Sequence, residues 1–305
     1  MAEPAELAGP EDPAVLVGGT GATRDVDRTG PVQTAGARPP GAVRTYLMLV
    51  RMWTRASWQY PTSLLLLTAT QLLATTMDFA TILIVFAHTR SLAGFPLAGV
   101  MFLYGTSATA FGLADLAIGN VDRLGRHIRL GTFDVMLVRP ASALAQLAAE
   151  EFSPRRVGKL ATALPVLAVA LTLMPVRWDA GRVLAVPVMV GAATLIYAAL
   201  WIIFSTTQFV AGDSPELLNT VVAGGSFLTQ YPLAIYGREV VRGLTWVVPL
   251  AFVNWQPALY VLGRPDPFGL PAALRFASPG VALVLTALAA LAWRAGIRHY
   301  RSTGS

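Results

Sequence analysis

The sequence contains no cysteine, a single lysine and few charged residues of either sign. Without cysteine, the chain cannot form disulfides, thiolate nucleophiles or cysteine-ligated zinc sites. Charged residues make up 13% of the 305 positions and hydrophobic residues 54%, whereas a soluble domain carries about 25% charged residues. So few charges cannot cover a surface that faces water, and we therefore expect most of the surface to face lipid.

The basic residues do not indicate a nucleic-acid partner. The formal net charge is +6, and almost all cations are arginines because Lys159 is the only lysine. The arginines gather in clusters between apolar runs. That arrangement is typical of residues that contact lipid headgroups and follow the positive-inside rule. Membrane lipid is therefore an expected partner, and nucleic acid is not.

Motifs for catalysis, metal binding and nucleotide binding are missing. The three histidines are far apart in sequence, and none has a neighbour at metal-ligand spacing. Gly158 and Lys159 resemble the end of a phosphate-binding loop. However, Leu160 replaces the Ser or Thr that holds magnesium, and no glycine lies five positions before Gly158. We expect no catalytic residue, no metal and no cofactor. Energy for uphill transport would have to come from a partner or an ion gradient.

The first 41 residues differ in composition from the rest of the chain. They are rich in Ala, Gly and Pro, contain no apolar run and lack the basic-then-apolar pattern of a signal peptide. We predict a disordered cytosolic tail over residues 1–41 and a membrane domain over residues 42–305.

Six apolar runs are long enough to cross a membrane, which takes about 20 residues of helix. The fifth run is the weakest, because it contains two adjacent glycines and a proline. An all-α membrane protein with six transmembrane helices follows from this count. The predicted spans are Ser63–Ala87, Leu97–Ile118, Val157–Val176, Val183–Val210, Leu217–Tyr236 and Val281–Ile297.

The distribution of arginine predicts the orientation of these spans. With the N-terminus inside, most of the 23 cations lie in cytosolic segments, as the positive-inside rule requires. Six spans then also place the C-terminus in the cytosol. The exceptions are Arg238, Arg242, Arg264 and Arg275, which all lie in one long outer loop where the rule is weaker.

That loop, Gly237–Gly280, contains an interrupted apolar stretch. Trp246–Leu262 is apolar but includes Pro249, Asn254 and Pro257. We interpret it as an external re-entrant pair of short helices buried against protein, since broken backbone at membrane depth needs protein or water partners. The alternative is an ordinary seventh span, which would move the C-terminal arginines outside.

An amphipathic stretch, Tyr46–Tyr60, precedes the first span. Trp53 and other apolar residues share one face, and Arg51 and Arg55 lie on another. We predict an N-terminal interfacial helix on the inner leaflet. An N-terminal extension of the first span is the alternative, which Pro61 disfavours.

Two acids lie inside the predicted spans, Asp78 in the first and Asp115 near the inner end of the second. Ionisable residues at such positions are functional candidates. Two acids without a buried cation make a weak proton relay, but Asp78 could lie on a substrate path. The alternatives are a structural hydrogen bond or a shortened span. Gly105 and Gly112 belong to a face of small residues on the second span, which we interpret as a helix-packing surface.

Three stretches together resemble a bacterial family of ABC type-2 transporter permeases. Arg126–Pro140 contains the family's Gly–x–x–Asp–x–x–Leu–x–Arg–Pro element. Tyr231–Tyr236, followed by Val248–Val253 and Gln256–Tyr260, is similar to its fifth span and external re-entrant region. Trp293–Gly304 resembles its C-terminal signature. The resemblance covers the chain from about residue 42 to the end.

This resemblance implies a permease subunit that lacks nucleotide-binding motifs and is not itself an enzyme. It would pair with a second six-span permease, identical or different, and with two copies of a cytosolic ATPase in the bacterial inner membrane. Export is the usual direction, and the apolar spans favour a hydrophobic or amphipathic substrate. The alternatives are an ion-coupled secondary transporter, an integral-membrane enzyme acting on lipid, and a structural scaffold.

The segment between spans two and three is the candidate contact with the ATPase. We expect its basic and acidic residues to make polar contacts, and Phe133 and Leu137 to serve as apolar anchors. An ordinary positive-inside loop is the alternative, and the inner loop Gly212–Glu216 is a second candidate contact. The coupling residues are Arg126, Arg129, Gly131, Phe133, Asp134, Leu137, Arg139 and Pro140.

An external gate is predicted at the outer end of the fifth span. Proline frees backbone carbonyls, so helices that contain it can bend and line a cavity. Placement of the tyrosines in an ordinary aromatic belt is the alternative. The gate residues are Tyr231, Pro232, Tyr236, Pro249 and Pro257.

Overall fold

A computed structural model describes residues 41–150, 156–211 and 219–300, which all belong to one compact unit. The tail predicted over residues 1–41 lies almost wholly outside the described residues, and so does the inner loop Gly212–Glu216. Within the described ranges the secondary structure is helical, apart from one isolated bridge between Leu92 and Phe95.

Four helices are long and apolar enough to cross a membrane. They coincide with four of the six predicted spans. The third prediction corresponds to a shorter helix, α7 (Val157–Leu173), of 17 residues. The fifth corresponds to a short helical stretch made of η3 (Asn219–Ala223) and α11 (Gly224–Thr229). This stretch ends before Pro232, which has no N–H to continue a helix. The four long helices are α2 (Pro61–His88), α3 (Leu97–Ile118), α8 (Ala180–Thr206) and α14 (Ser278–His299).

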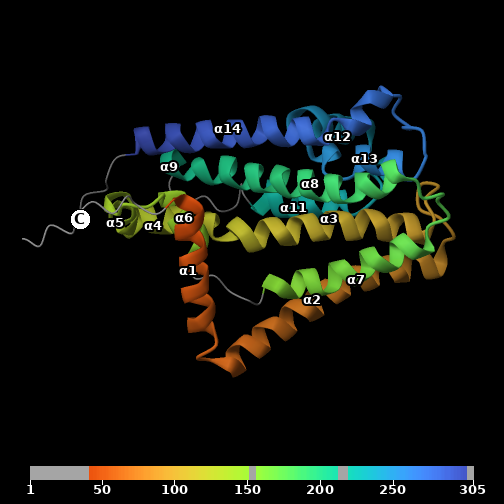
Figure 1. Cartoon of the computed structure of the whole chain (residues 1–305). Helices are drawn as coiled ribbons and strands as arrows, with labels where there is room; N and C mark the ends of the chain where they lie inside the picture. Colours follow the sequence, from red (N-terminus) through yellow and green to blue (C-terminus); the bar gives the residue numbers. More distant parts are fainter. Residues whose placement is uncertain (1–40, 151–155, 212–218, 301–305) are drawn as a thin grey trace, which may run out of the picture. The chain divides into compact units, whose positions relative to one another are not determined.

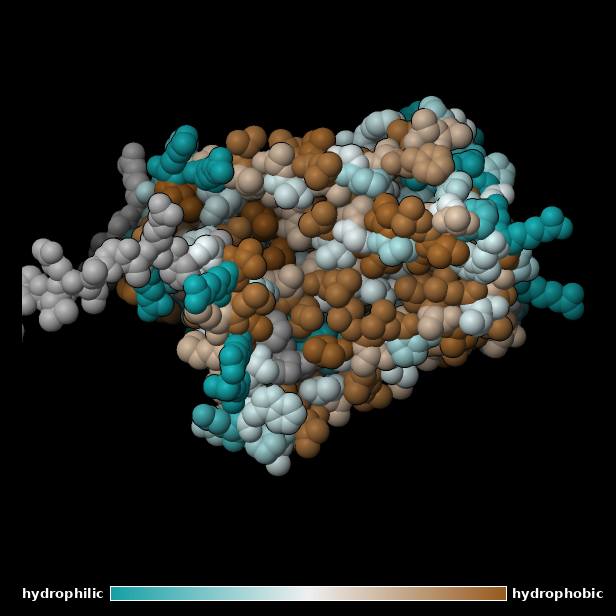
Figure 2. Space-filling model, viewed as in Figure 1, coloured by the Kyte–Doolittle hydropathy of each residue, from teal (hydrophilic) through white to brown (hydrophobic). Residues whose placement is uncertain are grey.

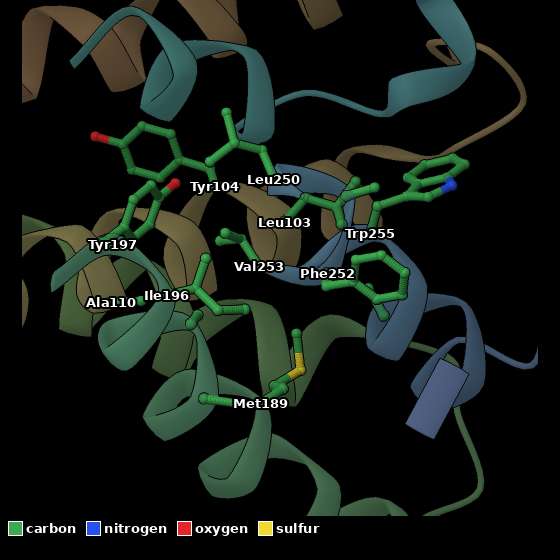
Figure 3. Packing of buried hydrophobic residues seen from close by; sticks show 14 of the residues in the cluster. Leu103, Tyr104, Ala110, Met189, Ile196, Tyr197, Leu250, Phe252, Val253 and Trp255 are labelled. Atoms are coloured by element: carbon green, nitrogen blue, oxygen red, sulfur yellow. The ribbon is translucent and has the colours of Figure 1, made fainter. Parts of the chain in front are cut away.

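Helix α3 lies at the centre of this bundle (Figure 1). It packs against α7 on one side and α8 on the other, while α8 also contacts α14, and α7 also contacts α2. In the most apolar stretch of α3, 72% of the residues are buried, against 6% in α2. The core around α3 and α8 includes Leu103, Ile196 and Tyr197 (Figure 3). Helix α2 is therefore the span that the described chain covers least.

Small residues allow α3 and α7 to approach closely. A Cβ added at Gly105 would lie 2.8 Å from the Cα of Leu167, and one added at Gly112 would lie 2.9 Å from a methyl group of Leu160. Neither position tolerates a larger side chain without moving its neighbour. The packing role predicted for these glycines is confirmed.

Short helices cap the bundle at the end where α12 and α13 lie (Figure 1). Trp246–Leu262 forms no single long helix, because Pro249 and Asn254 separate the short helices within it. Trp255 and Phe252 are buried and belong to the core cluster drawn in Figure 3. Pro257 lies in the first turn of α13, where no backbone donor is needed. These elements are α12 (Arg238–Arg242), η5 (Gly243–Val247), η6 (Leu250–Phe252), α13 (Trp255–Val261) and η7 (Ala272–Phe276).

The opposite end carries a compact group of short helices that we call the α4–α6 block. It consists of α4 (Leu124–Arg129), α5 (Thr132–Val138) and α6 (Ala143–Ala149), and η1 (Gly119–Arg123) joins it to α3. Its core contains Phe133, which packs against rings from α14 and from α9 (Gln208–Ala211).

The predicted amphipathic helix before the first span is confirmed as α1 (Ala42–Ser57), which is separate from α2. It runs across the bundle end and packs on α6 (Figure 1), and the Tyr46 hydroxyl donates to the carbonyl of Ala117 at 2.7 Å. Pro61 begins α2 at its first turn, so the chain changes direction between the two helices.

Apolar side chains cover the middle of the face shown in Figure 2, and hydrophilic side chains gather toward its two ends. Such an apolar band between polar ends is what a lipid bilayer requires of a protein that spans it.

Replacing Gly105 with alanine is expected to destabilise the protein by about 1–3 kcal/mol, because the added Cβ meets the backbone of α7 and forces the helices apart. A lower melting temperature of the purified protein in detergent measures this effect. Gly191→Ala is the matched control, since an added Cβ there has nothing within 4 Å. Equal melting temperatures for the two variants would contradict the close packing.

Candidate functional site

A polar face runs along the otherwise apolar helix α2. Gln71, Thr75 and Asp78 follow each other at steps of four and three residues, which places them on one side of a helix. The Thr75 hydroxyl is 2.6 Å from that of Thr162 on α7, and the Tyr104 hydroxyl of α3 donates to the Thr75 carbonyl at 3.2 Å. The face with Gln71, Thr75 and Asp78 therefore points toward α3 and α7, and the outward faces are mostly apolar.

This face lines a cavity of about 400 Å³, which we call the α2 cavity. Its wall combines polar groups with three aromatic rings, so it offers both hydrogen bonds and apolar contact. Residues from α2, α3, α7, η3 and α11 contribute, among them Gln71, Asp78, Tyr104, Phe111, Lys159, Ser226, Phe227 and Gln230.

An ionic cluster closes the α2 cavity at its Lys159 side. The Lys159 ammonium is 2.8 Å from Oδ2 of Asp115 and 4.7 Å from the centre of the Phe111 ring. Arg156 contacts the same carboxylate, with Nε 3.4 Å from Oδ1, and donates to the Asp115 carbonyl at 3.0 Å. A Cβ at Gly119 would overlap both Asp115 and Arg156, so glycine there leaves room for the cluster.

The cluster also reaches the α4–α6 block. Arg156 donates to Oδ1 of Asn120 at 2.8 Å, and the Asn120 amide donates to the carbonyl of Ala148 on α6 at 3.3 Å. A continuous set of polar contacts therefore joins the α2 cavity, the start of α7 and the α4–α6 block.

A second polar network supports the cavity wall at α11. The hydroxyls of Ser107, Tyr197 and Thr229 lie within 2.7–3.0 Å of one another. Asn254 adds its side-chain amide, which donates to the carbonyls of Leu103 at 3.0 Å and Thr229 at 2.6 Å. Buried polar groups that satisfy each other in this way fix the position of α11 against α3 and the α13 segment.

The predicted coupling residues fall on the α4–α6 block. Three basic side chains are exposed, as are Leu137 and Pro140, while Asp134 is partly buried and interacts with Tyr300. Gly131 begins α5 in the left-handed region, with φ of 67°, which favours glycine. The exposed basic residues are Arg126, Arg129 and Arg139.

The prediction that Phe133 is an exposed anchor is wrong. Its side chain is 0% exposed and lies at 5.2–6.4 Å, ring to ring, from Phe209, Trp293 and Tyr300. Phe133 therefore holds α5 to the bundle. Sequence reasoning also missed the apolar residues that are exposed on this block, because helix α5 is too short for its faces to be read from periodicity. These residues are Leu130, Val135 and Val138.

The structure separates the predicted gate residues into different surroundings. Tyr231 lies close enough to Asp78 for an electrostatic interaction between the two side chains. The Tyr236 hydroxyl donates to the Leu228 carbonyl at 3.3 Å. Pro257 instead lines another cavity, of about 260 Å³, between α8, α13 and α14. Pro232 is buried and Pro249 partly buried, each where the backbone leaves a helix.

Sequence reasoning also treated Asp115 as an acid without a nearby cation, and that was wrong. Its partner Lys159 is 44 residues away in the sequence. In the described part of the chain, no three His, Asp or Glu side chains are grouped so that they could hold a metal ion.

A family model described as "ABC-2 family transporter protein" matches residues 72–304. The chain belongs to this family. The match covers every residue of the α2 cavity except Gln71, together with the ionic cluster and the α4–α6 block. It confirms the resemblance to ABC type-2 permeases. No curated protein and no solved structure matches the chain. As an ABC-2 family member, the protein is a membrane permease of an ABC transporter, a transport component that normally pairs with an ATPase subunit.

Replacing Asp115 with alanine in this permease is expected to destabilise it by about 3–5 kcal/mol, because Arg156 and Lys159 lose their shared carboxylate in a buried place. The melting temperature in detergent should fall accordingly. Glu239→Ala removes an exposed ion pair with Arg242 and should change the melting temperature little. An Asp115→Ala protein as stable as Glu239→Ala would show that the cluster does not hold the fold.

Proposed function

We propose that this ABC-2 permease is one of two six-span subunits of an inner-membrane exporter that a separate cytosolic ATPase drives. The observation that carries the proposal is the polar connection from the α4–α6 block to the α2 cavity. Asn120 links α6 to Arg156, and Asp115 links Arg156 to Lys159, which itself lines the cavity. A displacement of the α4–α6 block by the ATPase would therefore move the cavity wall.

The two shorter elements complete six spans in this proposal. Helix α7 has 17 residues and a length of about 26 Å, slightly less than the roughly 30 Å of the hydrocarbon core. Arg156 and Lys159 lie at its start, where the Asp115 carboxylate compensates their charge. The fifth span combines η3 and α11, and the α12–α13 segment re-enters from the outer side. Both termini are then cytosolic.

The exposed face of the α4–α6 block suits an ATPase groove. Leu130, Val135 and Val138 expose apolar surface, and Val138 is 86% exposed. Arg126 and Arg139 are exposed on the same block. Apolar anchors surrounded by arginine are typical of protein interfaces. Leu137 and Pro140 extend this surface, while Gly131 and Phe133 set the position of α5 from within.

Helix α2 is where we place the second permease. The described chain leaves its outward faces uncovered, and Thr70, Thr76 and Thr81 are exposed there among leucines. Threonine is enriched where transmembrane helices contact each other. The α2 cavity would then lie beside the boundary between the two permeases, with an amphipathic substrate entering it from either.

Labelling of single cysteines tests the topology, and the chain has no native cysteine to interfere. Val240→Cys, on exposed α12, should react with a membrane-impermeant maleimide in intact cells. Val138→Cys, on α5, should react only after the membrane is permeabilised. Labelling of both sites from outside, or the reverse pattern, would rule out the proposed orientation.

Charge reversal at Arg126 and Arg139 together should abolish capture of the ATPase by the tagged permease and the ATP hydrolysis of the assembled complex. The reason is that the basic rim of the docking face becomes acidic while the core around Phe133 is untouched. Arg238→Glu with Arg242→Glu makes the same charge change on α12 and should leave both measurements unchanged. Retained capture by the Arg126 and Arg139 variant would assign the docking face elsewhere.

A further inference from the structure

The carboxylate of Asp78 has no partner in the described part of the chain. It forms neither a hydrogen bond nor an ion pair with any residue that the structure describes, although it lies in a transmembrane helix and borders the α2 cavity. A charge held at this depth is costly unless something compensates it. The missing compensation points to a ligand that supplies the opposite charge.

Lys159 is the nearby cation, and its direct contacts are already taken. Its ammonium interacts electrostatically with Asp78, but its direct contacts are with Oδ2 of Asp115, at 2.8 Å, and with the face of the Phe111 ring. An anionic ligand would have to compete with Asp115 for Lys159 and would also be repelled by Asp78. The charges on the cavity wall therefore disfavour an anion.

The remaining wall suits a cation with apolar groups. Tyr104, Phe111 and Phe227 line the cavity, and the faces of aromatic rings attract cations. Gln71 and Gln230 add amide oxygens that accept hydrogen bonds from an ammonium group. A volume of about 400 Å³ is within the range of sites for small organic ligands.

We propose that the α2 cavity binds an amphipathic organic cation, with Asp78 as its counter-charge and the aromatic wall around its apolar groups. Assigning this cation as the exported substrate rests on the proposed function, whereas the binding site itself does not. Thr75 lies one turn and Gln71 two turns before Asp78 on the same face, so they would contact the polar end of the same ligand.

Equilibrium binding of tetraphenylphosphonium to the purified full-length permease in nanodiscs tests the site, with empty nanodiscs subtracted. The wild-type protein should bind this cation saturably, and tetraphenylborate, an anion of the same shape, should not compete. Asp78→Asn should weaken binding about tenfold or more, because an ion pair outside water is worth several times its value in water. Glu239→Gln, which neutralises an exposed acid on α12, should bind as the wild type does.

Absence of saturable binding to the wild type, or effective competition by tetraphenylborate, would overturn the proposal without any variant. Unchanged affinity in Asp78→Asn, at a melting temperature equal to that of the wild type, would overturn the role of Asp78. Neither result depends on the ATPase. If the permease binds the cation but does not capture an ATPase, the binding site stands and the proposed function fails. If it captures an ATPase but does not bind the cation, the proposed function stands and only the proposed substrate class fails.

Discussion

The carboxylate of Asp115 organises this permease, because two cations from another helix converge on it. Arg156 and Lys159 both lie at the start of α7, and neither could enter this region without an anion to meet it. Their attraction fixes the beginning of α7 against the end of α3. The close approach at Gly105 and Gly112 follows from this fixed point, since α7 must then run along α3 with almost no space between the backbones.

The same cluster connects the α4–α6 block to the bundle. Arg156 satisfies Asn120, and Asn120 satisfies a carbonyl of α6, so the α4–α6 block is joined to the bundle by directed hydrogen bonds as well as by packing around Phe133. Apolar contacts tolerate sliding, whereas hydrogen bonds with a fixed direction do not. In the proposed function, these hydrogen bonds are the route by which a movement of the block would reach Lys159.

The sequence predicts the long spans well, because an apolar run of sufficient length has few other ways to satisfy its backbone in lipid. The prediction Leu97–Ile118 matches α3 at both ends. Sequence-based prediction fails for side chains whose surroundings come from distant parts of the chain. Phe133 looks like an exposed anchor until Phe209, Trp293 and Tyr300 are brought around it, and those residues lie more than 70 positions away. The pair Asp115 and Lys159, 44 residues apart, is equally invisible in the sequence, as is the α2 cavity beside it.

The single lysine of the chain lies where arginine would serve less well. A compact ammonium can contact Asp115 on one side and the face of Phe111 on the other, while its methylene stem lines the cavity. A guanidinium is planar and wider, and its five donors would need more partners than the cavity wall provides at this point. Arg156, three residues earlier, has those partners in Asp115 and Asn120. The two cations therefore have different roles in the cluster. Arg156 holds the α4–α6 block through Asn120, and Lys159 binds Asp115 at the edge of the α2 cavity. Asp78 is left as the charge on the cavity wall that a ligand could neutralise.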